Sequence, residues 1–296
     1  MIEREFEIEE ESGLKFYSST IASEKHPRKN EDSFFISENF GICGVFDAMG
    51  ESDFNEIASQ KAKEISLEEI NSWFGESVKD PEEKLRTLFE KLHYNLPRRI
   101  GDVFNRHPSW SWRLGLGVAA AVAVFIKDGD KRLVTVGNIG DSRIYLYGGS
   151  ELKLLSVDDR PGREEDYSSA LRNIRTKREL YKLFAAPKII QPLILLAFEK
   201  NRKTVTQVIG LGGEEEGKPP VPHIRTFEII TGETVLLCTD GIHDNLTDGE
   251  IVRILLQTKN PASCAEILCR KARAVSKKGV LRSKPDDVTA IVIKPV

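Results

Sequence analysis

Acidic residues recur in this chain where runs of apolar, strand-like residues begin or end. They are Glu31, Asp32, Asp47, Asp141, Asp240, Asp286 and Asp287. An acid beside a buried strand lies partly desolvated at a sheet edge, so several converging acids repel one another unless a cation lies between them. Ligation by oxygen alone suits Mg²⁺, Mn²⁺ or Ca²⁺, and no His/Cys cluster indicates zinc. A divalent-metal site is therefore one interpretation of the pattern.

Turn chemistry is the alternative interpretation of the same residues. Asp-Gly at Asp240 and Gly-Asp-Ser around Asp141 are also common in turns, and a single such acid is more typical of a turn than of a ligand. Spacing alone leaves both interpretations open. His243, three residues after Asp240, could reach the same cleft, but a turn-capping role is the simpler expectation.

Positioning these acids requires strands, and the hydrophobic pattern predicts many short ones. They are expected at Leu14–Ile21, Ser33–Ile36, Gly41–Phe46, Gly117–Ile126, Leu133–Asn138, Arg143–Tyr147, Leu152–Ser156, His223–Ile230, Thr234–Thr239 and Val288–Ile293. Helices are expected at Phe54–Trp73, from Pro81 until Leu96-Pro97 ends or kinks the helix, at Asp248–Gln257, and from Pro261 to about Ser276. Strands in runs, interrupted by helices in runs, indicate a layered α+β fold.

Composition and charge narrow the class of protein. The chain has 296 residues, 40% hydrophobic and 30% charged, which is typical of a globular protein. We expect one domain over residues 1–296, with an inserted, charged and partly helical segment at about 159–203. The net charge of −3 provides no field for nucleic acid or for a membrane surface.

The expected location is the cytoplasm. The N-terminal MIEREFEIEEE has acids where a signal peptide has bases and an apolar core, and the longest apolar run, about residues 118–126, is too short to span a bilayer. The four cysteines form no CxxC pair. The sequence leaves the oligomeric state open.

A series of short motifs covers the chain from about residue 13 to the C-terminus. In order they are Asn30-Glu31-Asp32-Ser33, Val45-Phe46-Asp47-Ala48-Met49-Gly50, Glu56-Ile57-Ala58-Ser59, Asn138-Ile139-Gly140-Asp141-Ser142-Arg143, Val205-Thr206-Gln207-Val208-Ile209-Gly210, the run from Gly232 to Gly241, and Asp286-Asp287-Val288-Thr289. With these motifs in this order, the chain resembles the PPM family of metal-dependent protein phosphatases, the type 2C serine/threonine phosphatases.

The resemblance implies a four-layer α-β-β-α sandwich of two antiparallel sheets flanked by helical pairs, with residues 159–203 as a flap beside a metal cleft. Two or three Mn²⁺ or Mg²⁺ ions per chain are implied, and no other cofactor. The implied ligands are Asp47, shared by two metals; Asp240 and Asp286, at the first metal; Glu31 and the Ala48 carbonyl, at the second, with Asp32 bonding its waters; and Asp141, with Asp240, at a weaker third site.

The implied reaction is hydrolysis of phosphoserine or phosphothreonine in a protein substrate by a metal-bridging hydroxide. Two alternatives remain open on the sequence. The chain could be a catalytically weak or inactive member that acts as a regulatory binding module, or it could act on a small phosphorylated metabolite.

Some positions depart from the family pattern. Asp47-Ala48 replaces the usual Asp-Gly, so the Ala48 carbonyl can bind metal only if the backbone there avoids positive φ. Glu51 adds a charge near the cleft, and Asp287 replaces a frequent asparagine. The family's phosphate-binding arginine would fall at Pro27, so Arg28, one residue later, either binds phosphate or faces solvent.

Overall fold

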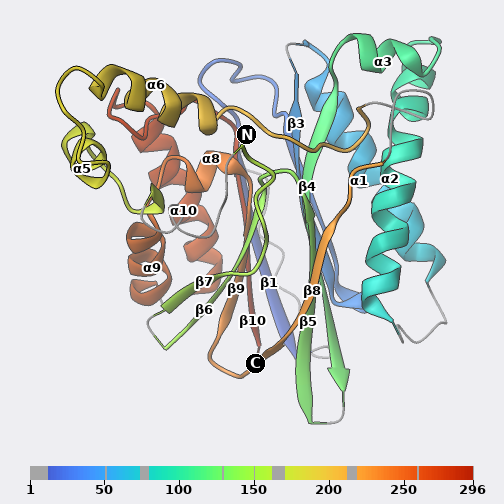
Figure 1. Ribbon diagram of the computed structural model, residues 1–296. Helices are drawn as coiled ribbons and strands as arrows, with labels where there is room; N and C mark the ends of the chain where they lie inside the picture. The colour runs from blue at the N-terminus through green and yellow to red at the C-terminus, as the bar shows by residue number, and fades with distance from the viewer. Residues whose placement is uncertain are drawn as a thin grey trace.

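Two five-stranded sheets stack face to face, and helices cover the outer face of each sheet (Figure 1). This computed structural model describes residues 13–50, 52–73, 80–128, 130–149, 151–161, 171–211, 219–258 and 260–295. Every pairing between neighbouring strands is antiparallel. The predicted four-layer α+β sandwich is therefore confirmed.

The first sheet has the strand order β1-β10-β9-β6-β7. Its strands are β1 (Leu14–Ile21), β6 (Arg143–Gly148), β7 (Glu151–Leu154), β9 (Thr234–Cys238) and β10 (Val288–Pro295). The N-terminal and C-terminal strands pair along their whole length, from Leu14 opposite Pro295 to Ile21 opposite Val288.

The second sheet has the order β2-β3-β4-β5-β8. Its strands are β2 (Asp32–Ser37), β3 (Ile42–Met49), β4 (Gly117–Asp128), β5 (Lys131–Ile139) and β8 (His223–Ile229). The 3₁₀ turn η1 (Glu38–Phe40) connects β2 to β3. Because β3 continues to Met49, Asp47 lies inside the strand rather than after it, and it pairs with Asp32 at the start of β2.

The long apolar run of β4 is explained by burial on both faces. Ala120, Val122 and Val124 face the helices, whereas the alternating residues Ala121 and Ala123 face the other sheet. Successive strand residues point to opposite faces, so a strand in a central layer must be apolar throughout.

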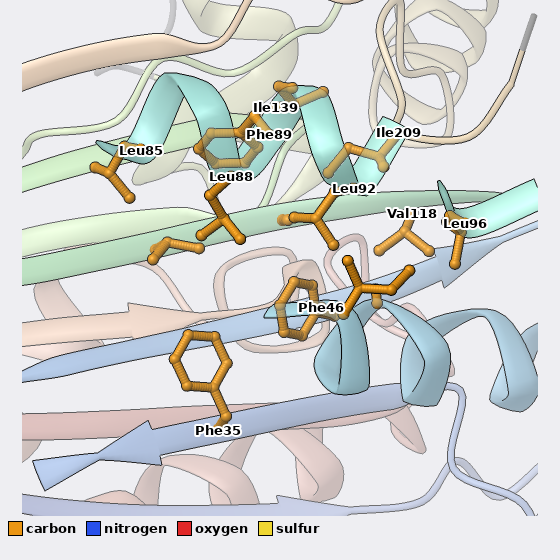
Figure 2. Close-up of a cluster of buried hydrophobic side chains, with 14 of the residues drawn as sticks. Phe35, Phe46, Leu85, Leu88, Phe89, Leu92, Leu96, Val118, Ile139 and Ile209 are labelled. Carbon is orange, nitrogen blue, oxygen red and sulfur yellow. The ribbon is translucent and has the colours of Figure 1, made fainter. Parts of the chain in front are cut away.

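Helices α1 (Asn55–Ser72) and α2 (Pro81–Val103) cover the second sheet. Asp80 caps α2 by accepting a hydrogen bond from the Glu83 amide, and Pro81 occupies the first turn, where no N–H is needed. Figure 2 shows the leucines of α2 directed at Phe46 and Val118 of the sheet. Burying each such side chain contributes about 1.5–3 kcal/mol.

Of the two outcomes expected at Leu96-Pro97, an end or a kink, the end is wrong, because α2 continues to Val103. Proline removes one backbone donor inside a helix, which usually weakens it. Here Leu96 and Ile100, on either side of Pro97, are fully buried, and their packing outweighs the lost bond. The short helix α3 (Ser109–Arg113), which we did not predict, follows.

Helices α9 (Asp248–Gln257) and α10 (Pro261–Ser276) cover the first sheet, with the bounds that the sequence predicts. Thr247 and Glu250 form a capping box at the start of α9, and Asn260 caps α10. The core between the two sheets contains Phe16 and Phe125 in edge-to-face contact.

The inserted segment contains α5 (Lys177–Leu183) and α6 (Gln191–Asn201), which Figure 1 draws on the same side of the sandwich as α8 (Asp240–His243), α9 and α10. Arg282 donates from Nη1 to the carbonyls of Leu171 and Ile174 in this segment, both at 3.3 Å. Its Nη2 donates to the carbonyl of Leu246, at 3.1 Å, and to that of His243. One buried guanidinium thus joins the segment to the turn that contains α8.

No helix among the described residues has both the length and the apolar character needed to cross a bilayer. Glu51 and the acidic N-terminal residues 1–12 lie outside the described part of the chain.

Candidate metal centre

The predicted acids gather at one end of the sandwich, where β2 and β10 begin and β3, β5 and β9 end (Figure 1). Asp47, Asp141 and Asp240 each have an oxygen within 4.8 Å of an oxygen of the other two. They come from β3, from the turn after β5 and from the start of α8. Residues 47, 141 and 240 therefore meet only through the tertiary fold.

Two glycines allow this convergence. Gly140, with φ +90°, approaches β4 so closely that a Cβ would lie 2.4 Å from Ala119 Cβ. Gly241 lies against the backbone before β10, and a Cβ there would lie 1.8 Å from the Asp287 carbonyl oxygen. Asp141 and Asp240 are the neighbours of these glycines, so the close contacts bring both carboxylates to the cluster.

The carboxylates of the cluster are held at high electrostatic cost. Burial, then repulsion from Asp240 and Asp32, raises the pKa of Asp47 well above its ordinary value. Burial is also the largest cause that raises the pKa values of Asp141 and Asp240, each to about 6. Asp286, next to this group, is partly exposed and adds to the repulsion on Asp240.

A divalent cation fits this arrangement. Asp141 Oδ1 and Asp240 Oδ1 are buried and have no hydrogen-bond partner in the described structure. An unpartnered buried carboxylate oxygen is costly, and a cation between these oxygens would remove both the missing contact and the repulsion. The donors are all oxygens, the set that Mg²⁺ and Mn²⁺ prefer.

Asp32 is held by hydroxyl groups. Its Oδ2 accepts hydrogen bonds from Thr239 Oγ1 and Thr289 Oγ1, both at 2.7 Å. Burial and the charge of Asp287 raise the pKa of Asp32 well above its ordinary value, against the effect of these two donors. Thr239 and Thr289 lie in the predicted motifs but were not predicted to bind Asp32, because only the pairing of β9 with β10 brings both hydroxyl groups to it.

Glu31 belongs to a second group, in which it lies with His26 and Asp287. Asn55 Nδ2 donates to Glu31 Oε2 at 3.1 Å, and His26 Nε2 lies 3.9 Å from the same oxygen. Asp287 accepts from the Glu31 amide at 2.7 Å with one oxygen and from the Ser23 amide at 2.5 Å with the other. An acid at this position binds both amides, which explains how it can replace asparagine.

Ala48 meets the condition set by the sequence. It lies within β3, and the non-glycine residues with positive φ in the described structure are Asn105 and Ala185. Its amide donates to the Glu31 carbonyl at 3.2 Å, so the backbone that would present the Ala48 carbonyl is fixed beside Glu31.

Arg28 is exposed in a turn, and no hydrogen bond or ion pair joins it to the acids within the described residues. Its role in phosphate binding stays a prediction. His243 is buried in α8, and its Nε2 lies 3.0 Å from the Asp141 carbonyl oxygen, a contact with the backbone of the turn after β5 that fits the expected turn-capping role. Burial, then the charge of Arg143, holds the pKa of His243 well below its ordinary value.

Two basic residues that sequence reasoning missed enter the acidic cluster. Lys284 Nζ bonds Asp240 Oδ2 and lies 3.1 Å from Asp286 Oδ2 and 3.3 Å from Asp244 Oδ2. Burial lowers the pKa of Lys284, but these carboxylates outweigh it and hold the pKa well above its ordinary value. Arg160 reaches the cluster from the other side and contacts Asp141.

The chain is similar in sequence to known protein phosphatases. The chain is 22% identical over 298 aligned residues to the probable protein phosphatase 2C 14 of Oryza sativa. The alignment covers 89% of this chain and 57% of the rice protein. It is 24% identical over 263 residues to the serine/threonine phosphatase stp of Listeria welshimeri, with coverage of 84% and 85%. The chain thus spans little more than half the length of the rice protein. No family model matches.

Solved structures of the same kind share the fold. The serine/threonine phosphatase PstP/Ppp of Mycobacterium tuberculosis superimposes with a TM-score of 0.64 at 20% identity, over 95% of this chain and 98% of that one. The catalytic domain of PstP in complex with two manganese ions superimposes with a TM-score of 0.62 at 20% identity, over 95% and 97%.

Proposed function

Because its curated relatives and its structural neighbours support membership of the PPM family of metal-dependent protein phosphatases, we propose that this chain hydrolyses phosphoserine and phosphothreonine in proteins. The observation that carries the proposal is the convergence of Asp47, Asp141 and Asp240, with two unpartnered buried oxygens among them. A cluster of this kind is stable at neutral pH when it holds cations.

We propose that the chain binds two divalent cations, either Mn²⁺ or Mg²⁺. Asp47, Asp240 and Asp286 would hold the first ion. Asp47 would also bind the second ion, together with Glu31 and the carbonyl oxygen of Ala48. When bound, such ions activate water at neutral pH and neutralise charge on a phosphoryl group. The PstP complex with two manganese ions supports this assignment by analogy.

The chain's own residues would hold these groups in place. The Asn55 side chain holds the Glu31 carboxylate, and the Asp287 carboxylate holds the Glu31 backbone. Glu31 is therefore oriented before an ion binds. Thr239 and Thr289 hold the Asp32 carboxylate in the same way, and Asp32 would bond a water of the second ion.

Further parts of the proposal concern the substrate and the location. Residues 159–203 would form a flap beside the cleft, within one domain that spans the chain, and Arg28 would bind the phosphate of the substrate.

A cytoplasmic location is supported by the free, buried thiols of Cys43, Cys238, Cys264 and Cys269.

The test compares hydrolysis of an aryl phosphate and of a phosphothreonine peptide, each with Mn²⁺ and with excess chelator. We expect turnover only with the ion. Asp47→Asn should abolish both turnover and saturable Mn²⁺ binding, whereas Asp53→Asn, a change of the same kind at an exposed carboxylate that pairs with Lys29, should alter neither.

The hydrolysis assay and the measurement of Mn²⁺ binding together decide between the alternatives. Saturable Mn²⁺ binding without turnover of either substrate would favour an inactive binding module. Turnover of the small ester with none of the peptide would favour a metabolite phosphatase. Turnover that persists in chelator would contradict the metal-dependent mechanism.

A further inference from the structure

Arg160 lies between the two carboxylates that the family resemblance assigns to a third metal. Its Nε and Nη2 donate to Asp141 Oδ2 at 3.0 and 2.7 Å. The same Nη2 lies 3.9 Å from Asp240 Oδ2. The side chain is nine-tenths buried, so this contact is part of the interior and not a surface ion pair.

The backbone holds Arg160 at this place. Asp159, its neighbour, accepts a hydrogen bond from the Gly140 amide at 2.8 Å, and its own amide donates to the Gly140 carbonyl at 2.9 Å. These two bonds fasten residue 159 to the turn that precedes Asp141. The next side chain along, that of Arg160, therefore extends directly over the Asp141 carboxylate.

The far end of the guanidinium is also fixed. Nη1 donates to Asp244 Oδ1 at 3.2 Å, and Nη2 lies 3.3 Å from Asp244 Oδ2. Asp158 Oδ2 lies 3.9 Å from Nε. Four carboxylates thus surround one guanidinium, which carries its charge at any pH at which the protein folds.

The two oxygens of each carboxylate in the cluster have different partners. Oδ2 of Asp141 accepts from Arg160, and Oδ2 of Asp240 bonds Lys284. Oδ1 of both residues has no partner in the described structure. Oδ1 of Asp240 is therefore left for the ion that Asp47, Asp240 and Asp286 would hold, whereas the Oδ2 side of both carboxylates already has positive charge supplied by the protein.

We propose, on the basis of the proposed function, that Arg160 takes the place of the third metal, so that this chain binds two divalent cations and not three. A dication placed between Asp141 and Asp240 on the Oδ2 side would meet a buried guanidinium and would find the Asp141 oxygen already bonded twice. Arg160 also lies at the start of the inserted segment, so its charge connects that segment to the metal centre without an ion.

The test counts Mn²⁺ per chain by calorimetric titration and by metal analysis after equilibrium dialysis. We expect two ions in the parent. Arg160→Met, which keeps much of the side-chain length and removes the charge, should gain a third and weaker site. Arg160→Lys should stay at two, because it keeps the charge. Arg178→Met, the same change at an exposed arginine of the inserted segment, is the matched control and should stay at two.

Three saturable ions in the parent would overturn the inference and would leave the phosphatase proposal intact. A folded Arg160→Met protein that still binds two would also overturn it. If Arg160→Met fails to fold, Asp141→Asn decides: we expect the count to stay at two, and a fall from two to one would refute us because Asp141 would then hold one of the ions. A parent that binds no Mn²⁺ and has no turnover would refute this inference and the proposed function together.

Discussion

Replacement of Gly241 by alanine tests whether backbone contact positions the metal ligands. Gly241 follows Asp240 in α8, and its backbone does not need positive φ. On helix propensity alone, alanine would stabilise this site by up to about 1 kcal/mol. The structure predicts the opposite, because the new Cβ would lie 1.8 Å from the Asp287 carbonyl oxygen and 2.9 Å from Val288 Cγ1.

The size of the effect follows from what must move. The obstructing atom is a backbone oxygen at the start of β10, so it must shift by at least about 1 Å to restore a normal contact, and the neighbouring acid Asp286 shifts with it. Overpacking of this kind costs about 1–3 kcal/mol, and we expect the upper end because no side chain can rotate away. A loss of about 3 kcal/mol corresponds to a fall in Tm of roughly 6–12 °C for a domain of this size.

The assay combines thermal unfolding without metal and calorimetric titration with Mn²⁺. Gly241→Ala should lower the Tm and weaken Mn²⁺ binding by at least about tenfold, since ligand positions must hold within a few tenths of an ångström. Gly249→Ala is the matched control, because Gly249 is also helical and a Cβ there meets only Asn173 Oδ1, at 3.7 Å. A Gly241→Ala protein that matches this control in both measurements would refute the reasoning.

Three further outcomes follow from the site. Thr289→Val removes one of the two donors to the buried Asp32 carboxylate, so the free energy of unfolding should fall by about 1.5–3 kcal/mol in urea titration, and a change under 0.5 kcal/mol would contradict the role of this hydroxyl. Arg28→Ala should lower kcat/KM for a phosphopeptide by about tenfold to a hundredfold, and a value within twofold of the parent would mean that phosphate is bound without it. Without metal, the folded protein holds protons on Asp141 and Asp240 up to a pKa of about 6, whereas the unfolded chain releases them near 3.8. Its stability should therefore fall as the pH rises from about 4 to 6, and Mn²⁺ should restore it at pH 7; metal-free unfolding curves that show rising stability across this window would be inconsistent with a buried acidic cluster.

Local signals made most of the fold predictable. The bounds of α9 and α10 match the prediction because their caps, Thr247 and Asn260, are encoded beside the helices themselves. The bounds of β1 match because it begins after Gly13 and lies between the apolar residues Leu14 and Ile21. The continuation of α2 past Pro97 was missed because it depends on packing against the second sheet, which the local sequence does not contain.

The acids of the site were predictable and their basic partners were not. Each acid lies in a motif at or near the end of a strand, so its place at a sheet end can be predicted from neighbouring residues. Arg160 lies 84 residues from Asp244, and Lys284 lies 44 residues from Asp240. Nothing near Arg160 or Lys284 in the sequence distinguishes it from a solvated surface charge, and only the folded arrangement brings either to the cluster.

The bonds from Arg282 have a consequence for how this protein can diversify. The oxygens that Arg282 binds in the inserted segment belong to the main chain of Leu171 and Ile174, and main-chain oxygens are the same whichever residues carry them. Selection can therefore replace the outward side chains of the segment without loosening this attachment. A library that randomises the exposed positions of α5 and α6 should return folded proteins at high frequency. Each would present a new surface while the attachment through Arg282 stays the same.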